Sequence, residues 1–541
     1  MDDAPRAPGR LAGPALFAVA AAVCAYFANG LIRRPVDDLV GFVSDDAFYY
    51  LQTARNLAAT GRPTFDGVHA TNGFHPGWMA ITTLLAKLFA NRETLLRAAL
   101  WTSFALHLAA ALVLVRVCRR FVSPFWAWVL GALWAVNPLP ITLAMQGVEA
   151  PLHLFALALT AYAFTGLVAQ RPWSPGLPDV RERDLVRFGA ALGFLFWART
   201  DAVLVVAVTL PYIALMAGRS AAPRVVAIVG CVFAIATLPW FVWSYMTTGS
   251  LVQDSGAVKM MWADAAHASM TTTQRAEDAL RFAAGRWTGL PASLLTSSPA
   301  LTGWIAGAVF VAVVAFSLVC VRRFREPRGL ATTAIWLLAS AAFVGLVYGA
   351  YFTDQMLWYS GLPGLALFLV GALCTADALR RIAALRRPAL HVAAGAAAVV
   401  GGIFLFARYS EPMRDSGGNR RMPFEYPWQR DVLASQRAFD AQVPGNARIG
   451  CFNAGIPAYF GTHTVVNLDG LVNHDLVEVY RRGDIWAWLS NERIEFIADE
   501  SLALGRAQKL TNNRFHLTVV TTSPLHGWVT PTRFLWRVEP R

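Results

Sequence analysis

The chain has 541 residues, of which 56% are hydrophobic and only 15% are charged. Soluble domains carry about 25% charged residues, so this composition excludes an ordinary soluble protein and predicts a polytopic α-helical membrane protein. The net charge of +13 is of the sign that nucleic-acid binding requires, but its distribution argues against that function, because the arginines form short clusters between apolar runs, as the positive-inside rule describes. The six cysteines include no CxxC pair, which argues against a disulfide framework or a zinc site.

The first apolar run, residues 11–32, is long enough to span a membrane, and we interpret it as an uncleaved signal anchor. The run at 76–90 contains Lys87 and is shorter than the roughly 20 residues of a span, so we expect a helix lying in the outer interface. Residues 188–217 form either two spans or a broken hairpin. Further apolar runs, each expected to cross once, lie at 98–117, 123–141, 148–169, 223–246, 300–320, 330–350, 357–375 and 388–408. Together with the first run and two crossings from 188–217, they predict about eleven crossings.

Cytoplasmic placement of the arginine clusters puts the N-terminus inside and the C-terminus outside. The membrane domain then covers residues 1–408, with outer loops at 33–97 and 247–299. From residue 409 the chain becomes polar, and β-like runs alternate with helix-like ones, which predicts a small α/β domain over 409–541 on the outer side. The β-like runs are "ARIGCF", "HTVVNLDG", "IEFIADE", "FHLTVVTT" and "RFLWRVE".

Two adjacent carboxylates, Asp45 and Asp46, begin a predicted helix in the first outer loop. Acidic residues at a helix N-terminus are favoured by the helix dipole, and this structural role is one interpretation. The other is that one carboxylate is a general base for an acceptor hydroxyl, while its neighbour orients it or holds a cation. Tyr49 and Tyr50 follow one turn later, as interface aromatics or as side chains that contact a sugar.

The segment "TNGFHPGW", residues 71–78, combines a turn with a helix start, because Pro76 suits the first helical turn. His75 either belongs to this turn alone or lies beside the carboxylates and binds a phosphate. Glu149, at the outer end of a later span, is a candidate catalytic residue, with snorkelling to the interface as the alternative. Arg199 either pairs with Asp201 at a helix break or helps to neutralise a lipid phosphate.

In the second outer loop, Lys259 is a candidate phosphate ligand or a solvated surface lysine. Trp358 and Tyr359 lie at a later outer boundary, as membrane-belt aromatics or as substrate contacts. The unusual polar residues all map to the outer face, which indicates an enzyme acting on a phosphate-bearing lipid. A transporter is instead expected to place polar residues near the midplane, at paired broken helices.

At these residues the chain resembles the GT-C superfamily of polytopic glycosyltransferases, and in particular the bacterial family similar to protein O-mannosyltransferases and the lipid A aminoarabinose transferase. The resemblance rests on "DDAFYYLQTARNLAATG", "TNGFHPGW", "GVEAPL", "ARTDA" and "LVQDSGAVKM". It implies transfer of a sugar from a polyprenyl-phosphate donor, with Asp45 as general base, Asp46 beside it, and Glu149 as a second acidic residue. His75 and Pro76 match the "HP" of the relatives.

The chain departs from that pattern in two places. Asp46 stands where the protein O-mannosyltransferases carry glutamate, and the C-terminal domain is not their β-trefoil module. Within that domain, Asp469, Asn473 and His474 either face the site or, as we favour, cap a strand-to-helix turn.

If the sugar is transferred in a single displacement, we expect inversion at the anomeric carbon and an oxocarbenium-like transition state. No cofactor is required, although a divalent cation is possible at the carboxylates. The acceptor is a glycan, a lipid or a protein, and the expected location is a bacterial inner membrane with a periplasmic site. The alternatives are a lipid flippase with a carboxylate proton relay, a scaffolding protein and a lipid A phosphotransferase.

Overall fold

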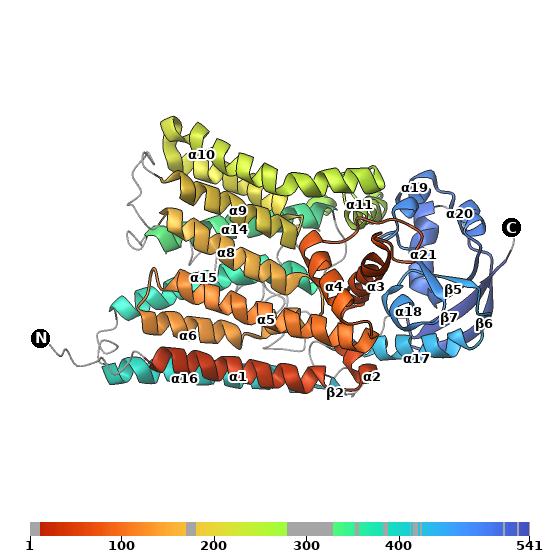
Figure 1. The fold of residues 1–541 in the computed structure, drawn as a ribbon, viewed down its shortest axis with the longest axis horizontal. Helices are drawn as coiled ribbons and strands as arrows, with labels where there is room; N and C mark the ends of the chain where they lie inside the picture. The colour runs from red at the N-terminus through yellow and green to blue at the C-terminus, as the bar shows by residue number, and fades with distance from the viewer. Residues whose placement is uncertain are drawn as a thin grey trace, which may run out of the picture.

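The computed structural model describes residues 11–168, 180–277, 328–351, 356–381, 388–411, 413–414, 420–421, 425–511, 514–526 and 530–539. Long apolar helices form a bundle, and a smaller α/β domain lies at one end of it (Figure 1). The bundle comprises α1 (Ala12–Ile32), α5 (Arg92–Cys118), α6 (Pro124–Ala135), α7 (Pro138–Met145), α8 (Ala150–Val168), α9 (Glu182–Ala198), α10 (Ala202–Thr248), α14 (Arg328–Tyr351), α15 (Gly361–Arg381) and α16 (Pro388–Tyr409).

Among the described residues, six helices are long and apolar enough to cross a membrane, or seven if α6 and α7 together make one span. The predicted run at 123–141 falls on α6 and α7, which meet at a bend of 46°. The break follows from Asn137, whose side chain caps α7, and from Pro138 in its first turn. The predicted run at 300–320 lies outside the described residues, and the total of eleven crossings stays a prediction.

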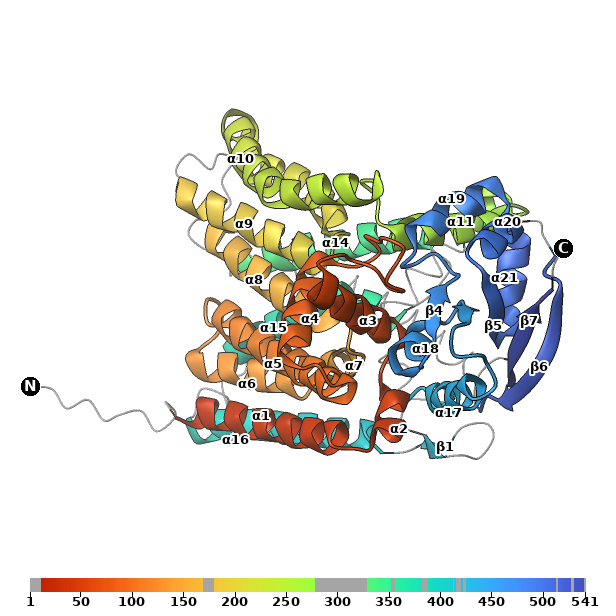
Figure 2. The same ribbon diagram turned by 45° about the vertical axis from the view of Figure 1, so that its right-hand side comes forward.

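Helix α10 is 47 residues long, yet it is two helices joined at Gly218, whose φ of 76° is not helical. The chain folds back sharply there (Figure 2). Glycine is suited to this corner because left-handed backbone is strained for residues with a Cβ. The first arm corresponds to the second half of the predicted segment 188–217 and the second arm to the predicted run 223–246, and α9 packs along α10.

A layer of short elements separates the bundle from the α/β domain (Figure 2). The first outer loop supplies α2 (Val36–Leu39), the 3-10 turn η1 (Val40–Phe42), α3 (Asp45–Thr60) and α4 (Pro76–Leu88). At 13 residues α4 is too short to cross a bilayer, as expected from its sequence. Later segments add α11 (Asp254–His267) and the 3-10 turn η2 (Leu357–Ser360).

The C-terminal domain is built on a five-stranded sheet in the order β4-β3-β5-β7-β6. Strands β4, β3 and β5 are parallel, whereas β7 and β6 are antiparallel, so the predicted α/β class and its five strand runs are confirmed. The strands are β3 (Arg448–Cys451), β4 (Thr464–Asn467), β5 (Ile494–Glu500), β6 (Leu517–Pro524) and β7 (Thr532–Val538). The helices are α17 (Trp428–Asp440), α18 (Gly455–Phe460), α19 (His474–Arg482), α20 (Ile485–Asn491) and α21 (Ser501–Thr511). A two-stranded ribbon, β1 (Met413–Arg414) with β2 (Arg420–Arg421), precedes them.

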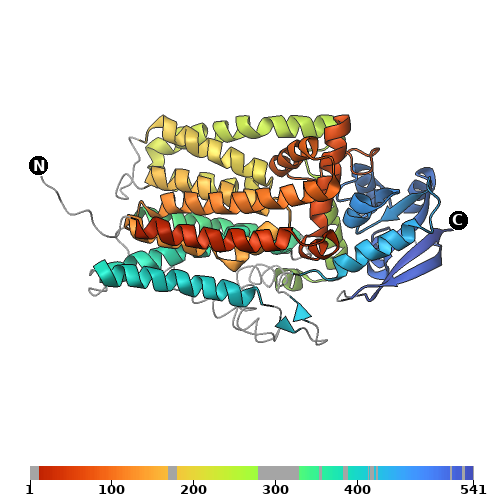
Figure 3. The same ribbon diagram turned by 60° about the horizontal axis from the view of Figure 1, so that its bottom comes forward.

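One face of this sheet packs directly on the first outer loop. Tyr49 and Phe65 from that loop join Ile449, Phe496 and Leu535 in a single buried cluster. The main apolar core of the bundle also continues into α17 and α18. The domain therefore shares its hydrophobic core with the loop and the bundle, at the end opposite the start of α1 (Figure 3).

Candidate active site

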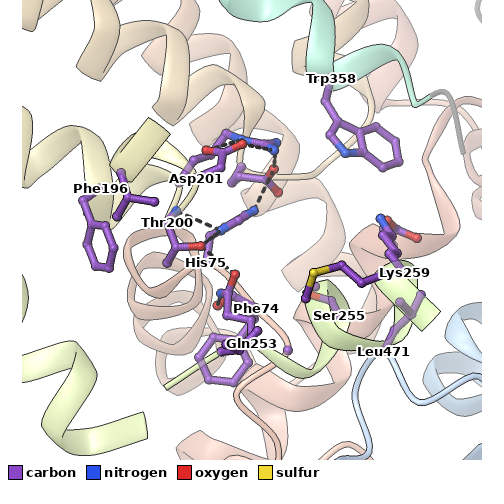
Figure 4. Close-up of a pocket in the computed structure, with 18 of the residues that line it drawn as sticks. Phe74, His75, Phe196, Thr200, Asp201, Gln253, Ser255, Lys259, Trp358 and Leu471 are labelled. Carbon is purple, nitrogen blue, oxygen red and sulfur yellow. Dashed lines mark hydrogen bonds and ion pairs between the residues drawn. The ribbon is translucent and has the colours of Figure 1, made fainter. Parts of the chain in front are cut away.

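A cavity of about 400 Å³ opens between α3, the α9–α10 junction, α11 and α14. We call it the first cavity. Figure 4 shows His75, Thr200 and Asp201 on one side of it and Lys259 and Trp358 on the other. Most sequence-predicted site residues line it, namely Asp46, Tyr49, His75, Glu149, Arg199, Lys259, Trp358 and Tyr359.

A buried ion cluster forms where the chain leaves α9. Arg199 follows the last residue of that helix with extended backbone and is 3% exposed. Its guanidinium donates to Glu149 Oε1 at 2.5 Å and to Asp201 Oδ2 at 2.7 Å. The cluster thus holds one cation and two carboxylates, so the charge of Arg199 is already neutralised by protein groups.

Tyr50 and His75 extend this cluster toward the first outer loop. The Tyr50 hydroxyl donates to Glu149 Oε2 at 3.0 Å and accepts from the His75 amide at 3.1 Å. The Thr200 amide donates to His75 Nδ1 at 3.2 Å, which places the ring proton on Nε2, 3.6 Å from Glu149 Oε1. Burial lowers the pKa of His75 to about 4, so the ring is neutral at pH 7.

Lys259 supplies a second cation from α11, beside the Tyr359 ring that Arg199 also contacts. Its ammonium donates to the Tyr359 hydroxyl at 3.0 Å and lies 5.7 Å from the centre of that ring. Tyr359 in turn packs 4.7 Å from Tyr348, centre to centre. Trp358, 6% exposed, is buried beside them rather than displayed on the outside of the bundle.

The two adjacent carboxylates at the start of α3 have different surroundings. Asp45 Oδ1 accepts from the Ile456 amide at 3.1 Å, and Oδ2 accepts from the Gly455 amide at 3.2 Å, both at the first turn of α18. Burial raises the pKa of Asp45 to about 7 despite these two donors. Asp46 is half-buried and lines the first cavity, which Asp45 does not.

Tyr49 also binds the C-terminal domain. Its hydroxyl accepts from the Ala454 amide at 3.1 Å and lies 2.9 Å from the Phe452 carbonyl and 3.1 Å from Asp469 Oδ2. Asp45 and Tyr49, one turn apart on α3, therefore hold the β3–α18 connection by its backbone amides.

A second cavity of about 270 Å³ lies between α3 and the C-terminal domain. Asp46, Tyr49, Trp358 and Leu471 line both cavities, so the two meet at this group of side chains. Asp45 and Asp469 line only the second cavity.

Asp469, Asn473 and His474 were expected either to face the site or to cap a turn, and Asp469 does both. It accepts from the Leu471 amide at 2.7 Å within the turn, and it lines the second cavity. Asn473 makes no side-chain cap to α19 and instead donates to the Asn467 carbonyl at 3.2 Å. His474 reaches across to Asp254 Oδ1 at 2.6 Å.

Asp254 is a structural residue whose role the sequence did not reveal. It is 1% exposed and accepts from the Thr71 hydroxyl at 2.9 Å and the Asn72 amide at 3.1 Å, besides its contact with His474. It therefore ties the first outer loop, α11 and the C-terminal domain together. Tyr348 was also missed, although it contacts both Arg199 and Asp201.

Within the described part of the chain, no group of three or more histidine, cysteine, aspartate or glutamate side chains is arranged to hold a metal ion.

A helical membrane bundle, a buried polar site at one end and an α/β domain over that site agree with the GT-C-like fold that the resemblance in the sequence implies. Among solved structures, ArnT from Cupriavidus metallidurans bound to undecaprenyl phosphate matches with a TM-score of 0.55 at 14% identity, covering 98% of this chain and 100% of that one. The apo oligosaccharyltransferase of Archaeoglobus fulgidus matches with a TM-score of 0.53 at 13% identity, covering 98% of this chain and 76% of that one.

Both matches cover 98% of this chain, so the fold implied by the resemblance in the sequence is confirmed. At these identities the likeness concerns the fold alone. No family model matches the chain, and no curated protein matches it by sequence.

Proposed function

We propose that this protein is a membrane glycosyltransferase that moves a sugar from a polyprenyl-phosphate donor to an acceptor hydroxyl. The observation that carries the proposal is the position of Asp46, which lines both cavities where they meet. A carboxylate in that position has access to a donor in one cavity and an acceptor in the other, which is the arrangement that general-base catalysis of group transfer requires.

The first cavity suits a lipid-linked phosphate. Its walls are mainly apolar and aromatic, and Lys259 provides a cation outside the Arg199 cluster. A polyprenyl chain requires apolar walls, whereas the phosphate requires a cation. The apolar side chains include Phe196, Trp240, Phe241, Leu251, Val347 and Tyr351. The fold it shares with ArnT bound to undecaprenyl phosphate supports the same class of donor.

In the proposed reaction Asp46 takes the proton of the acceptor hydroxyl. The acceptor oxygen then forms a bond to the anomeric carbon, and the bond from that carbon to the phosphate oxygen breaks, releasing polyprenyl phosphate. One displacement inverts the anomeric carbon. Lys259 stabilises the negative charge that develops on the departing phosphate.

The contacts favour Asp46 over Asp45 as the base, which departs from the assignment implied by family resemblance. Asp45 already accepts from two backbone amides of α18 and does not line the first cavity. Its proposed role is to position α18 and, through the shared helix turn, Asp46. Glu149 and Arg199 hold one another, so we assign them to orienting His75 and Tyr50, and not Glu149 to catalysis or Arg199 to binding phosphate.

The orientation follows from the arginine clusters, which we place in the cytoplasm. The site and the C-terminal domain then face the periplasm of a bacterial inner membrane. The polyprenyl-phosphate carrier is in this account the lipid partner, and no metal or organic cofactor takes part in the proposed steps.

The test is to incubate the purified protein in lipid nanodiscs with a panel of radiolabelled polyprenyl-phosphate sugars. Consumption of one donor that disappears in Asp46→Asn supports the proposal. If no donor is consumed and none binds, the assignment as a glycosyltransferase for these donors is wrong, and a lipid transporter becomes the better explanation.

A further inference from the structure

The second cavity lies at the carboxyl ends of the parallel strands of the C-terminal sheet. Asn453 follows β3, Asp469 follows β4 and Glu500 ends β5, and all three line the cavity. In open α/β sheets, ligands bind in the crevice beyond the carboxyl ends of the strands. Here that edge of the sheet meets the start of α3, where Asp46 lies.

Gln429 provides independent support for a ligand at this place. It is 1% exposed and lines the cavity from the first turn of α17. Neither its amide nitrogen nor its amide oxygen has a hydrogen-bond partner among the described residues. Burying an amide with both groups unsatisfied is unfavourable unless something else binds it. Its donor and acceptor match a ligand hydroxyl, which can accept from one and donate to the other.

The remaining lining is aromatic and acidic. Trp262, Trp358, Tyr426, Trp428, Phe452 and Tyr480 provide ring surfaces. Carboxylates come from Asp45, Asp46, Asp469 and Glu500, whereas Arg506 is the lone lysine or arginine among the described lining residues. Rings that cover apolar faces, with carboxyl groups and amides that bind hydroxyls, suit a neutral polyol, and the shortage of cations disfavours a phosphate or another anion.

We propose that the second cavity binds the terminal sugar of a glycan acceptor and presents one of its hydroxyls to Asp46. This inference rests on the proposed function and names the acceptor class for it. The cavity, at about 270 Å³, lies just below the 300–1,000 Å³ typical of pockets for drug-sized ligands, so it holds the end of a glycan rather than a long stretch. The proton passes from the bound hydroxyl to Asp46 as the new glycosidic bond forms.

The experiment measures binding without donor. Fluorescently labelled full-length protein in detergent is applied to printed arrays of neutral oligosaccharides, of anionic oligosaccharides and of serine- and threonine-containing peptides. We expect binding to neutral oligosaccharides, weakened by roughly 10- to 100-fold in Gln429→Leu because two hydrogen bonds to the sugar are lost. Arg506→Ala, on the exposed rim, weakens binding less and keeps the fold intact.

The matched control is Gln442→Leu, an exposed glutamine of the same domain outside the cavity, which binds as the wild type does. Thermal unfolding separates a ligand site from a structural role, since Gln429→Leu removes an unsatisfied buried amide and should unfold at or above the wild-type temperature. Lower stability together with unchanged glycan binding overturns the inference, as does binding only to peptides, only to anionic glycans or to nothing on the arrays.

The two proposals fail separately. A wild-type protein that consumes a polyprenyl-phosphate sugar, but whose glycan binding does not depend on Gln429, contradicts the acceptor site and leaves the glycosyltransferase assignment standing. Glycan binding that depends on Gln429, with no donor consumed in the presence of the bound glycan, contradicts the glycosyltransferase assignment instead.

Discussion

Gly455 begins α18 against the start of α3, and a side chain there has no room. A Cβ at this position would lie 2.4 Å from the Asp45 carbonyl oxygen and 2.6 Å from its Oδ1. Because non-bonded heavy atoms prefer about 3.5 Å, α18 and α3 must separate by roughly 1 Å to accept alanine. Overpacking of this kind costs about 1–3 kcal/mol, and a 1 Å misplacement beside reacting groups lowers turnover by about 100-fold.

Gly455→Ala is therefore expected to lower both the thermal midpoint, measured by tryptophan fluorescence in detergent, and the rate of sugar transfer. Gly455 is not among the left-handed residues, so the change acts through contact rather than through backbone strain. Gly445→Ala is the matched control, since a Cβ at Gly445 meets no atom within 4 Å. If the two variants unfold and turn over alike, the contact between Asp45 and α18 does not hold the site in place.

The other predictions concern charge. Lys259→Ala should raise the KM for a polyprenyl-phosphate sugar by about tenfold or more, because a charge-assisted contact to the phosphate is lost. Lys259→Arg should retain part of the affinity. Equal KM values for Lys259→Ala and the wild type would show that Lys259 does not bind the phosphate. Glu149→Gln should lower the thermal midpoint markedly, because breaking a buried ion pair costs about 3–5 kcal/mol, and an unchanged midpoint would contradict the cluster built on Arg199. Burial raises the pKa of Asp45 from 3.8 to about 7, so between these values the folded protein binds a proton that the unfolded chain has released. The stability that this group contributes is therefore lost as the pH rises toward 7. Between about pH 5 and about pH 8, the thermal midpoint of Asp45→Asn should fall less than that of the wild type, because asparagine does not titrate. Parallel curves of midpoint against pH for the two proteins would refute this. Transfer should persist after dialysis against EDTA, and a loss restored by a divalent cation would show that the carboxylates work with a metal.

The fold was largely predictable because apolar runs and charge clusters are local signals. The short run that contains Lys87 could be excluded as a span from its length, and the five strand runs of the C-terminal domain were evident from their β-branched and aromatic residues. The bend between α6 and α7 was missed although its signal is local, because Asn137 and Pro138 form a helix-start pair whose polarity is averaged out over a window of about 20 apolar residues.

The candidate site was predictable in composition but not in arrangement. Both Asp45 and Asp46 begin the same helix, and no local feature tells which carboxylate faces the cavity. The answer depends on backbone amides of Gly455 and Ile456, about 410 positions later in the chain. Likewise, nothing in the sequence around Gln429 distinguishes it from other polar residues. Its burial without a hydrogen-bond partner follows from the packing of the C-terminal domain against α3, which only the structure shows.

The most direct test of the central claim compares Asp46→Asn with Asp45→Asn in one assay of sugar transfer from the polyprenyl-phosphate donor that the wild type consumes. General-base catalysis contributes about 10²- to 10⁴-fold, so Asp46→Asn should lose at least that much kcat, whereas Asp45→Asn should retain measurable turnover and show its main defect in stability. An active Asp46→Asn beside an inactive Asp45→Asn would contradict the assignment of Asp46 as the base between the two cavities.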